Sequence, residues 1–385
     1  MTPLPSAWAE IDLKSIRHNF CAVRAAARRQ LAPRAGHGVD ILAVVKADAY
    51  GHGMAAAAGV IARAGGRFFA VSNAGEGVAL RLSGCPHRII FFEATLPGDI
   101  PFLLKHDLTP AVCTMDFARA LDRAARRISS RQRVPVHVKI DTGMGRLGVW
   151  HQDAAVFIRE LALLKNISVE GLFTHFPLAD SDAVFTRGQM DDFGALVTAL
   201  GREGMTFKYL HAANSMGLGA YKNHFFNLAR PGVMLYGLYP APELAPAIRL
   251  KPVMSVKARV LFVKTIRGGC GVSYGHTFKA GKDIPAAVVA IGYSDGYSRS
   301  FSNKAHLLIN GRACPVLGRV TMDQTVVDIS SALRAGVVQA GDTAVVLGRQ
   351  GKKAISADDL AAWAGTIHYE IVCSLGNRLP RRYIS

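Results

Sequence analysis

Residues 41–63 read ILAVVKADAYGHGMAAAAGVIAR: a short apolar run, a loop with glycines and a segment rich in alanine. The apolar run ILAVVK (41–46) is typical of a buried strand, and Met54–Arg63 has the periodicity of a helix. A strand followed by a helix is the repeating unit of parallel sheets. The stretch therefore predicts a parallel α/β fold if the same unit recurs along the chain.

The unit does recur, as far as about Gly237. Val184–Glu203 is a second clear helical segment. The strand candidates that follow the first are FFAVS (68–72), RIIFFE (88–93), TPAVC (109–113), VPVHVKID (134–141), SVEGLFTH (168–175), KYLHAANS (208–215) and ARPGVMLYG (229–237). Strict alternation over about 200 residues favours a (β/α)8 barrel of the TIM type over an open, doubly wound sheet.

The chain changes character after the proline-rich linker PAPELAP (240–246). Short alternating strands with glycine turns follow, which are typical of an antiparallel β domain. They include VMSVKARVLFVKTI (253–266), IPAAVVAIGY (284–293), HLLING (306–311) and DTAVVLG (342–348). We therefore predict an α/β barrel over residues 12–243 and a β domain over residues 244–385, with a strand within 1–11 packing on the β domain.

The composition excludes a disordered chain, because 50% of the 385 residues are hydrophobic and only 19% are charged. Lys and Arg number 46 against 28 Asp and Glu, a formal charge of +18, which raises the question of nucleic-acid binding. The arginines are spread out, however, and the densest stretch, Arg119–Arg133, suits the solvated face of a helix better than a polyanion site. We expect no nucleic-acid partner.

The cysteines and the N-terminus point to the cytoplasm. The six cysteines form no CxxC pair, so we expect reduced and mostly buried thiols: Cys21, Cys85, Cys113, Cys270, Cys314 and Cys373. The first residues lack the basic and apolar regions of a signal peptide. No stretch of about 18 apolar residues is present, so no membrane span is expected.

Gly143–Gly148 fits the dinucleotide pattern G-x-G-x-x-G after a strand, with Glu170 about 20 residues on, at the end of the next strand. Asp141 precedes the first glycine, and a carboxylate there would repel a pyrophosphate. The motif also follows the fifth strand rather than opening a Rossmann unit. A glycine-rich active-site loop that carries Arg146 is the favoured interpretation.

Lys46 stands at the end of the first strand, where barrel enzymes build their active sites. A lysine there is either held in an ion pair or used as an amine, because desolvation lowers the pKa of lysine and makes it a nucleophile or Schiff-base former. Tyr50 follows with Gly51 and Gly53, a hydroxyl and flexible backbone that suit an anionic ligand.

The late strands complete the same mouth, since phosphate sites in barrels often lie after strands seven and eight. His175 ends the sixth strand and is placed to contact Arg230, for which a salt bridge at the strand end is the alternative. The candidates from strands seven and eight are Asn214, Ser215, Arg230, Gly232 and Val233. The sequence shows no metal-binding spacing, no Walker lysine loop and no GxSxG elbow.

Nine motifs occur in an order that resembles the alanine racemase family: AVVKADAYGHG, KIDTGMGRLG, GLFTHF, HAANS, ARPGVMLYG, GVSYGHTF, AIGYSDGYSR, GRVTMDQ and YEIVCSLGNRLPR. This resemblance runs from WAEIDL to RLPRRY. The family consists of pyridoxal 5'-phosphate enzymes with an N-terminal barrel and a C-terminal β domain. It implies interconversion of L-alanine and D-alanine by two bases on a Schiff base of the cofactor, which supplies D-alanine for the cell wall.

The resemblance also implies roles for matching residues. Lys46 matches the lysine that holds the cofactor, and Tyr274 matches the second base, which the other subunit of a homodimer contributes. Arg230 matches the arginine that faces the pyridine nitrogen, with His175 as its partner. The phosphate cradle corresponds to Tyr50, Ser215, Gly232, Val233 and Tyr369, with Asn214 beside it.

Further positions correspond to the surroundings of the substrate. Arg146, Met322 and Asp323 match residues near the substrate carboxylate and the phenol of the second base, and Tyr293 matches an entry-channel tyrosine. Lys139 matches a position that is carboxylated in many members and that orients Arg146. Thr321 departs from the family, where many members have cysteine, and we expect little consequence.

Three alternatives stay open. The first is a racemase of serine, lysine or many amino acids. The second is a decarboxylase of the same architecture, for which Cys373 is a conceivable catalytic thiol. The third is a non-catalytic pyridoxal-phosphate carrier, which consists of a barrel alone. GVSYG, the spacing of Lys46 and Tyr50, and the β domain favour alanine racemase.

Overall fold

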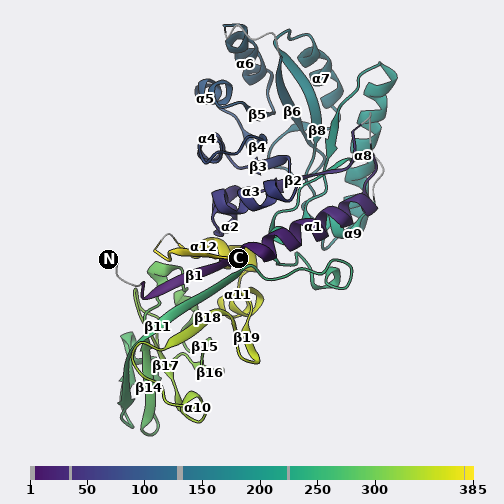
Figure 1. Ribbon diagram of the computed structural model, residues 1–385. Helices are drawn as coiled ribbons and strands as arrows, with labels where there is room; N and C mark the ends of the chain where they lie inside the picture. Colours follow the sequence, from purple (N-terminus) through teal and green to yellow (C-terminus); the bar gives the residue numbers. More distant parts are fainter. Residues whose placement is uncertain (1–4, 34–36, 128–132, 223–225, 377) are drawn as a thin grey trace. The chain divides into compact units, whose positions relative to one another are not determined.

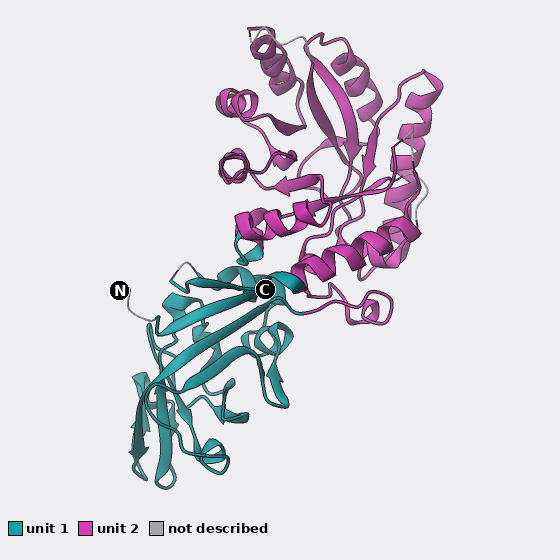
Figure 2. Ribbon diagram, viewed as in Figure 1, with its two compact units in different colours: residues 1–14, 50–53, 252–385 teal, residues 15–49, 54–251 magenta. Residues whose placement is uncertain are grey.

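The computed structural model describes residues 5–33, 37–127, 133–222, 226–376 and 378–385. Contacts divide these residues into two compact units, shown in Figure 2. The β unit comprises residues 1–14, 50–53 and 252–385, and the barrel unit comprises residues 15–49 and 54–251. The division into functional domains at residues 243 and 244 stays a prediction.

Eight parallel strands form the nearly closed barrel, in the order β10-β2-β3-β4-β5-β6-β8-β9. Their bounds are β2 (Asp40–Val44), β3 (Phe68–Val71), β4 (Arg88–Ala94), β5 (Leu108–Val112), β6 (Val134–Asp141), β8 (Ile167–Phe173), β9 (Tyr209–His211) and β10 (Leu228–Ala229). A two-residue strand, β7 (Val149–Trp150), pairs with β6. The apolar runs are buried on both faces, as expected for strands of a barrel that helices cover.

Asn227 joins the last two strands. Its backbone N–H donates to the carbonyl of Leu210 at 3.1 Å, while its side-chain oxygen accepts from the Leu210 N–H at 3.0 Å and its amide donates to the carbonyl of Lys208 at 2.8 Å. Three residues later the Arg230 N–H donates to the carbonyl of Ala213 at 2.7 Å. The backbone that carries Arg230 is therefore fixed to the neighbouring strand.

Helices alternate with these strands (Figure 1). Their bounds are α1 (Leu13–Gln30), α3 (Met54–Arg63), α4 (Ala74–Leu82), α5 (Ile100–Lys105), α6 (Met115–Arg127), α7 (Ala154–Ala162), α8 (Ala183–Arg202) and α9 (Ser215–Ala220). In α6, Phe117 and Leu121 are buried whereas Arg119 and Arg123 are exposed, which is the predicted solvated face. Residues 128–132 of the arginine-rich stretch lie outside the described residues.

Two predicted strands are much shorter than expected. The stretch 229–237 contributes only its first residue to β10, because Pro231 has no N–H for a ladder and a 3-10 turn, Val233–Tyr236, follows. The stretch 208–215 forms a strand only over Tyr209–His211, since Asn214 caps helix α9. The loops at this end of the barrel are correspondingly longer.

The β unit is a mainly antiparallel sheet in the order β16-β15-β18-β11-β1-β20, with β14, β17 and β19 attached. Its strands are β1 (Ala7–Asp12), β11 (Met254–Ile266), β14 (Ile284–Val289), β15 (His306–Ile309), β16 (Arg312–Pro315), β17 (Thr325–Asp328), β18 (Thr343–Gln350), β19 (Lys353–Ile355) and β20 (Arg381–Ile384). Separate from this sheet, β12 (Gly271–Val272) pairs with β13 (Phe278–Lys279). The helices are α10 (Ser330–Leu333), α11 (Ala357–Ala364) and α12 (His368–Ser374).

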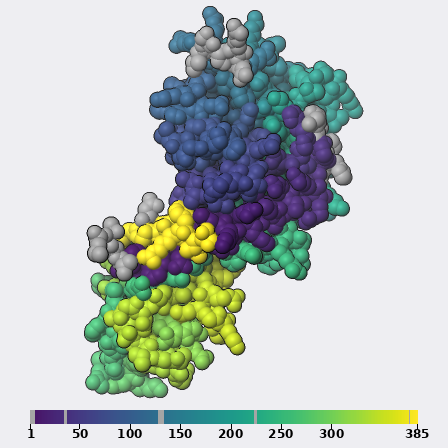
Figure 3. Space-filling view, viewed as in Figure 1, coloured from purple at the N-terminus to yellow at the C-terminus, as the bar shows by residue number. Residues whose placement is uncertain are grey.

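The two ends of the chain meet in this sheet. Strand β1 pairs antiparallel with β11 and parallel with β20, so the C-terminal residues lie beside the N-terminal strand (Figure 3). The N-terminal segment is thereby part of the β unit.

The cysteines differ from the prediction of mostly buried thiols. Cys85 and Cys314 are buried, Cys113 is half-buried, and the other three are exposed: Cys21, Cys270 and Cys373. All six are free thiols. Among the described residues, no helix is long and apolar enough to cross a membrane.

Candidate active site

Lys46 lies two residues beyond the end of β2 and opens the short turn α2 (Lys46–Tyr50). The turn is left-handed: φ and ψ are 50° and 51° at Ala47, 51° and 46° at Asp48, and 57° and 47° at Ala49. Tyr50 continues it with φ of 55°. Four consecutive residues other than glycine in this region are strained, at about 1–2 kcal/mol each. Such strain is typical of functional sites.

Two carboxylates stabilise the strained turn. Glu76 accepts the N–H of Ala47 and the N–H of Ser72, both at 2.7 Å, and Asp48 accepts the N–H of Met54 at 2.7 Å. Each bond to a carboxylate is stronger than a neutral hydrogen bond. The backbone on either side of the turn is thus held, and Lys46 has a defined place at the barrel mouth.

Arg230 is buried, and the structure shows how its charge is accommodated. Nη1 donates to the carbonyl of His211 at 2.6 Å and contacts Nδ1 of His211 at 3.1 Å. Nη2 donates to the carbonyls of Thr174 at 2.7 Å and Ala212 at 3.0 Å, and contacts Nδ1 of His175 at 3.3 Å. No carboxylate pairs with Arg230 among the described residues, so the alternative of a salt bridge is wrong. Among the described residues, no protein group accepts a hydrogen bond from its Nε–H.

Burial, together with the charge of Arg230, lowers the pKa values of the basic groups around it. Burial lowers the pKa of Arg230 to about 9, so it is still charged at neutral pH. Burial, reinforced by Arg230 and Arg146, lowers the pKa of Lys139 to about 7. Burial, followed by Arg230, Lys139, Arg146 and Lys46, holds the pKa of His175 well below its ordinary value. His175 is therefore neutral, and its Nδ1 is free to accept from the guanidinium.

Asp141 decides the function of the glycine-rich loop. Its carboxylate accepts the N–H groups of Gly143 and Met144 at 2.9 Å and of Gly145 at 3.1 and 3.2 Å. These are the amides that a pyrophosphate would need, so the dinucleotide interpretation is wrong. The loop instead presents Arg146, whose side chain is exposed.

The loops after β9 and β10 are brought together by hydrogen bonds. Asn214 caps α9: its side-chain oxygen accepts the Gly217 N–H at 2.8 Å, and its amide donates to the carbonyl of Phe176 at 3.3 Å. The Ser215 hydroxyl accepts the Gly232 N–H at 3.0 Å. Val233 follows directly as the first residue of a 3-10 turn. The loops that carry Asn214 and Ser215 after β9, and Gly232 and Val233 after β10, therefore lie together in the barrel unit.

In the β unit, Tyr50 lies near Tyr369 of α12, with ring centroids 6.3 Å apart. Burial, with smaller contributions from Tyr369 and Cys373, raises the pKa of Tyr50 far above its ordinary value, so its hydroxyl keeps its proton and can donate. Gly51 has φ of +79°, and a Cβ there would approach the carbonyl oxygen of Val372 to 2.4 Å. Glycine at position 51 therefore permits the close contact between the Tyr50 segment and α12.

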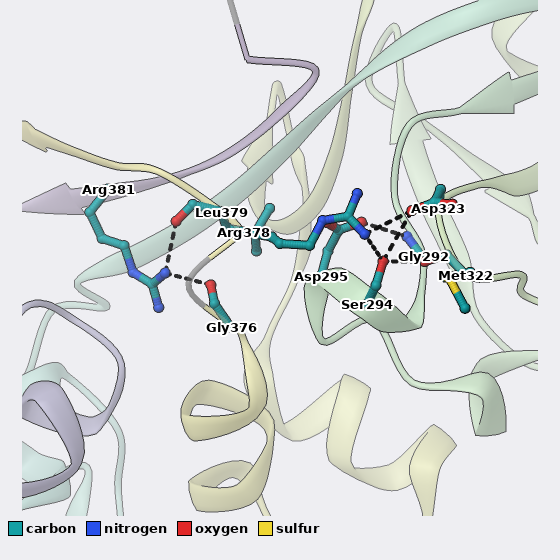
Figure 4. A network of polar contacts seen from close by, with 9 residues as sticks. All are labelled: Gly292, Ser294, Asp295, Met322, Asp323, Gly376, Arg378, Leu379 and Arg381. Carbon is teal, nitrogen blue, oxygen red and sulfur yellow. Dashed lines mark hydrogen bonds and ion pairs between the residues drawn. The ribbon is translucent and has the colours of Figure 1, made fainter.

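Met322 and Asp323 belong to a second network, shown in Figure 4, and Tyr293 is bonded to the same segment through its backbone. The Tyr293 N–H donates to the carbonyl of Thr321 at 3.0 Å, and the Ser294 hydroxyl donates to the carbonyl of Met322 at 2.6 Å. Arg378 donates to Asp323 at 2.7 Å and to the Ser294 hydroxyl. The Arg378 guanidinium holds the pKa of Asp323 below its usual value, so this carboxylate is ionised at neutral pH.

The hydroxyl of Thr321 closes the turn that presents this network. It donates to the carbonyl of Gln324 at 2.8 Å. A cysteine at this position would make this contact only weakly.

Tyr274 is 71% exposed on the β unit. It follows Ser273, whose φ is 60°, and precedes Gly275, whose φ is 70°. The Ser273 hydroxyl donates to the carbonyl of Arg319 at 2.6 Å and holds the turn in place. The phenol is thus presented on a constrained turn and is open to solvent in this chain.

Sequence reasoning missed His211, which contacts Arg230, and His137, which contacts His211. His137 and His211 are fully buried. Glu170 lies within β8 and is buried against Arg88, rather than at the end of a strand near a nucleotide. A usable signal was present, because His137 lies two residues before Lys139 and so shares a face of the strand with it.

Among the described residues, no cluster of three or more acidic, histidine or cysteine side chains could hold a metal ion.

The fold and these side chains define a class: a barrel with an amine at its first strand end and a buried guanidinium at its last, joined to a β domain. Residues 11–240 match the family model described as alanine racemase, N-terminal domain, and residues 253–383 match alanine racemase, C-terminal domain. The chain therefore belongs to the alanine racemase family.

Individual relatives match this chain over nearly their whole length. Alanine racemase of Halothermothrix orenii is 39% identical over 98% of this chain and 96% of the relative. The structure of alanine racemase from Bacillus anthracis with bound L-Ala-P has a TM-score of 0.88 at 30% identity and covers 100% of this chain and 96% of that one. A structure from Bartonella henselae, described as having covalently bound pyridoxal phosphate, has a TM-score of 0.83 at 25% identity and covers 99% and 100%.

Proposed function

We propose that this chain interconverts L-alanine and D-alanine with pyridoxal 5'-phosphate, using Lys46 and Tyr274 as the two bases, and so supplies D-alanine for the cell wall. The observation that carries the proposal is the hydrogen bonding of Arg230. Protein groups occupy its Nη1 and Nη2 donors, and among the described residues the Nε–H is left for a ligand. An aromatic ring nitrogen is a suitable acceptor for that donor.

The donor set of the barrel unit fits the cofactor. When bound, pyridoxal phosphate withdraws electrons from the amino acid and makes its α-proton acidic. Lys46 would hold the aldehyde carbon, and Arg230, with His175 behind it, would face the ring nitrogen. The phosphate would be held by Tyr50, Ser215, Gly232, Val233 and Tyr369, with Asn214 supporting the loop.

Arg230 limits how strongly the ring attracts electrons. A guanidinium donates hydrogen bonds but does not readily give up its proton at neutral pH. With a pKa of about 9, Arg230 is charged there. The ring nitrogen would receive a hydrogen bond rather than a proton, which favours return of the α-proton over loss of the amino group.

Two bases on opposite faces of the α-carbon account for inversion. Lys46, once displaced from the cofactor by the substrate amine, takes or returns the proton of D-alanine, and Tyr274 that of L-alanine. The exposure of Tyr274 supports a role in an active site shared with a second copy of the chain, so we propose a homodimer. Arg146, Met322 and Asp323 would bind near the substrate carboxylate, and Tyr293 would line the entry channel.

Lys139 is a candidate for carboxylation. Its pKa of about 7 leaves a large share of the side chain as the neutral amine at neutral pH. A neutral amine adds to CO2 to give a carbamate and releases one proton. The resulting anion would orient the Arg146 guanidinium, whose charge already acts on Lys139.

A panel of L-amino acids, each incubated with the purified protein and pyridoxal phosphate and analysed by chiral chromatography, tests the function. We expect equal amounts of D- and L-alanine at equilibrium, and little change of serine, lysine or arginine. Decarboxylation products or dominant turnover of another amino acid would contradict the proposal. Borohydride reduction and peptide mapping should place the cofactor on Lys46, and Lys105→Met is a matched control that should leave the labelled peptide unchanged.

A further inference from the structure

Behind Arg230, a line of buried side chains crosses the barrel interior. Nη1 of Arg230 lies 3.1 Å from Nδ1 of His211. Nε2 of His211 lies 2.7 Å from Nδ1 of His137. Nε2 of His137 lies 4.0 Å from Oε2 of Glu170. The line thus connects the end of β10 with β9, β6 and β8.

Packing fixes both imidazole rings in this line. His137 and His211 are both fully buried. The His211 ring stacks on Phe173 at 4.8 Å with an interplanar angle of 3°, and the His137 ring stacks on Tyr209 at 6.0 Å and 15°. The stacks hold the planes of both rings, and in this arrangement each nitrogen has the neighbour described above.

Charge fixes the far end of the line. Glu170 is 7% exposed and pairs with Arg88 and, at 3.3 Å, with Lys208. The carboxylate of Glu170 lies against these two cations, and a carboxylate accepts hydrogen bonds and does not donate them. Nε2 of His137 has no hydrogen-bond partner among the described residues, and the Glu170 carboxylate is the acceptor it approaches.

The protons on the line then follow from donor and acceptor rules. A guanidinium only donates, so Nδ1 of His211 must be the bare nitrogen. The proton of a neutral His211 is therefore on Nε2 and is donated to Nδ1 of His137. The proton of His137 is in turn on Nε2 and is directed at the carboxylate. Only this arrangement puts one proton in each contact.

We propose that Glu170, His137 and His211 are positioning residues that orient Arg230 by fixing one tautomer at each histidine. The direction of the line follows from the Arg230 guanidinium, which only donates, and the Glu170 carboxylate at the far end faces the N–H of His137 as an acceptor. With Nη1 and Nη2 anchored, the Nε–H has a single direction. The rest of the proposal depends on the proposed function. There the Nε–H of Arg230 would point at the ring nitrogen of pyridoxal phosphate, which would stay hydrogen-bonded and unprotonated.

The charged surroundings agree with neutral histidines. Burial, followed by Arg88 and Arg230, lowers the pKa of His137 to about 3. Burial, with His137, Arg230 and Lys139, holds the pKa of His211 well below its ordinary value. Both rings are therefore neutral at neutral pH.

Neutron diffraction from crystals of the deuterated holoenzyme tests the tautomers directly. We expect deuterium on Nε2 of His137 and of His211 and none on either Nδ1. Deuterium on Nδ1 of His211, or on both nitrogens of either ring, would overturn the proposal. The measurement uses the wild-type chain and no substrate, so it decides the matter even if the protein racemises no amino acid, the result that would contradict only the proposed function.

Glu170→Gln tests the consequence for Arg230. When Arg230 is less well oriented, its hydrogen bond to the ring nitrogen is weaker. The amino group of alanine then passes more often to pyridoxal phosphate. The products are pyridoxamine phosphate and pyruvate. We expect the ratio of pyruvate formed to alanine racemised to rise about tenfold, which corresponds to about 1.4 kcal/mol. Glu203→Gln, in an exposed pair with Arg159, is the matched control and should leave the ratio unchanged.

A purely structural role would lower racemisation and pyruvate formation together and would leave their ratio constant. That result, in a Glu170→Gln protein of unchanged melting temperature, would overturn the positioning role. If Glu170→Gln does not fold, the neutron result alone accepts or rejects the fixed tautomers on which the role depends.

Discussion

At the scale of single residues, burial without a carboxylate partner is the feature that sets the chemistry of the barrel unit. Arg230 and Lys139 are 4% and 5% exposed. Burial lowers the pKa of Arg230 to about 9 and that of Lys139 to about 7. Arg230 stays a cation at neutral pH, whereas about half of the Lys139 side chains are neutral amines there. Two basic residues on the same barrel are thus suited to different tasks.

Arg230→Glu tests the first task. A carboxyl group facing the ring nitrogen can share or transfer a proton, which a guanidinium does not do. We expect racemisation to fall by about a hundredfold, as when a preorganised donor is removed, and pyruvate formed per racemisation to increase. Arg202→Glu, exposed at the end of α8, is the control for the charge reversal. An unchanged pyruvate ratio would argue against a role of Arg230 at the ring nitrogen.

Lys139→Gln tests the second task by NMR with 13C-labelled bicarbonate. We expect one carbamate signal in the wild-type protein, absent in Lys139→Gln and still present in Lys165→Gln, an exposed control. Because the pKa of Lys139 is lowered to about 7, the amine is neutral above that pH and protonated below it. The signal should therefore fade as the pH falls through about 7. A wild-type protein without any carbamate signal at pH 8 would refute carboxylation.

Site residues at strand ends were predictable, whereas residues inside the barrel were not. Lys46, His175 and Arg230 stand where the alternation of strands and helices places a barrel mouth. His137 and His211 lie within predicted strands, and a histidine there looks like any core residue until the neighbouring strand is known. Their partnership depends on the registers of β6 and β9 with the strand between them, β8, which no local pattern contains.

At the scale of elements, the left-handed turn after Lys46 is the least regular part of the barrel unit. Sequence patterns placed α3 at Met54–Arg63, as the structure does, because alanine periodicity reports right-handed helices. The preceding residues Ala47 and Ala49 have the same side chain and the opposite handedness. Intrinsic preference therefore cannot predict the turn. It is held by Glu76 and Asp48, which accept N–H groups at its two ends.

Ala47→Gly should relieve part of the strain. Glycine has no Cβ and enters the left-handed region without steric penalty, so we expect the free energy of unfolding to rise by about 1 kcal/mol. Ala55→Gly, at an exposed position of right-handed α3, is the matched control and should lower it by about 1 kcal/mol. Urea unfolding measures both changes. A loss of stability in Ala47→Gly equal to that in Ala55→Gly would show that the turn is not strained.

At the scale of the whole molecule, the charge of +18 is only partly explained. Lys46, Arg146 and Arg230 have places in the proposed site. The exposed arginines of α6 have none, although a positive surface attracts anionic ligands weakly. Sequence reasoning predicted both the α/β barrel and the antiparallel β domain, because apolar residues recur with a different period in each. Sequence reasoning could not predict which residues belong to each compact unit. Tyr50–Gly53, for example, joins the β unit through contacts with residues more than 300 positions away.

The proposed assembly makes a prediction that no single chain can satisfy. Lys46→Ala and Tyr274→Phe should each be nearly inactive as homodimers. If each site combines Lys46 of one subunit with Tyr274 of the other, a hybrid dimer has one complete site and one that lacks both groups. Random exchange in an equal mixture should therefore restore about a quarter of the wild-type activity.

A second mixture separates sharing from other effects of exchange. Lys46→Ala and Arg230→Glu both alter the barrel unit, so every site in their hybrids lacks one of the two groups. This mixture should recover nothing under conditions in which the first does. Mass spectrometry of isotope-labelled subunits confirms that exchange has occurred. No recovery in the first mixture despite complete exchange would show that Lys46 and Tyr274 do not act across the subunits. Equal recovery in both mixtures would show that the recovery does not depend on sharing these two groups.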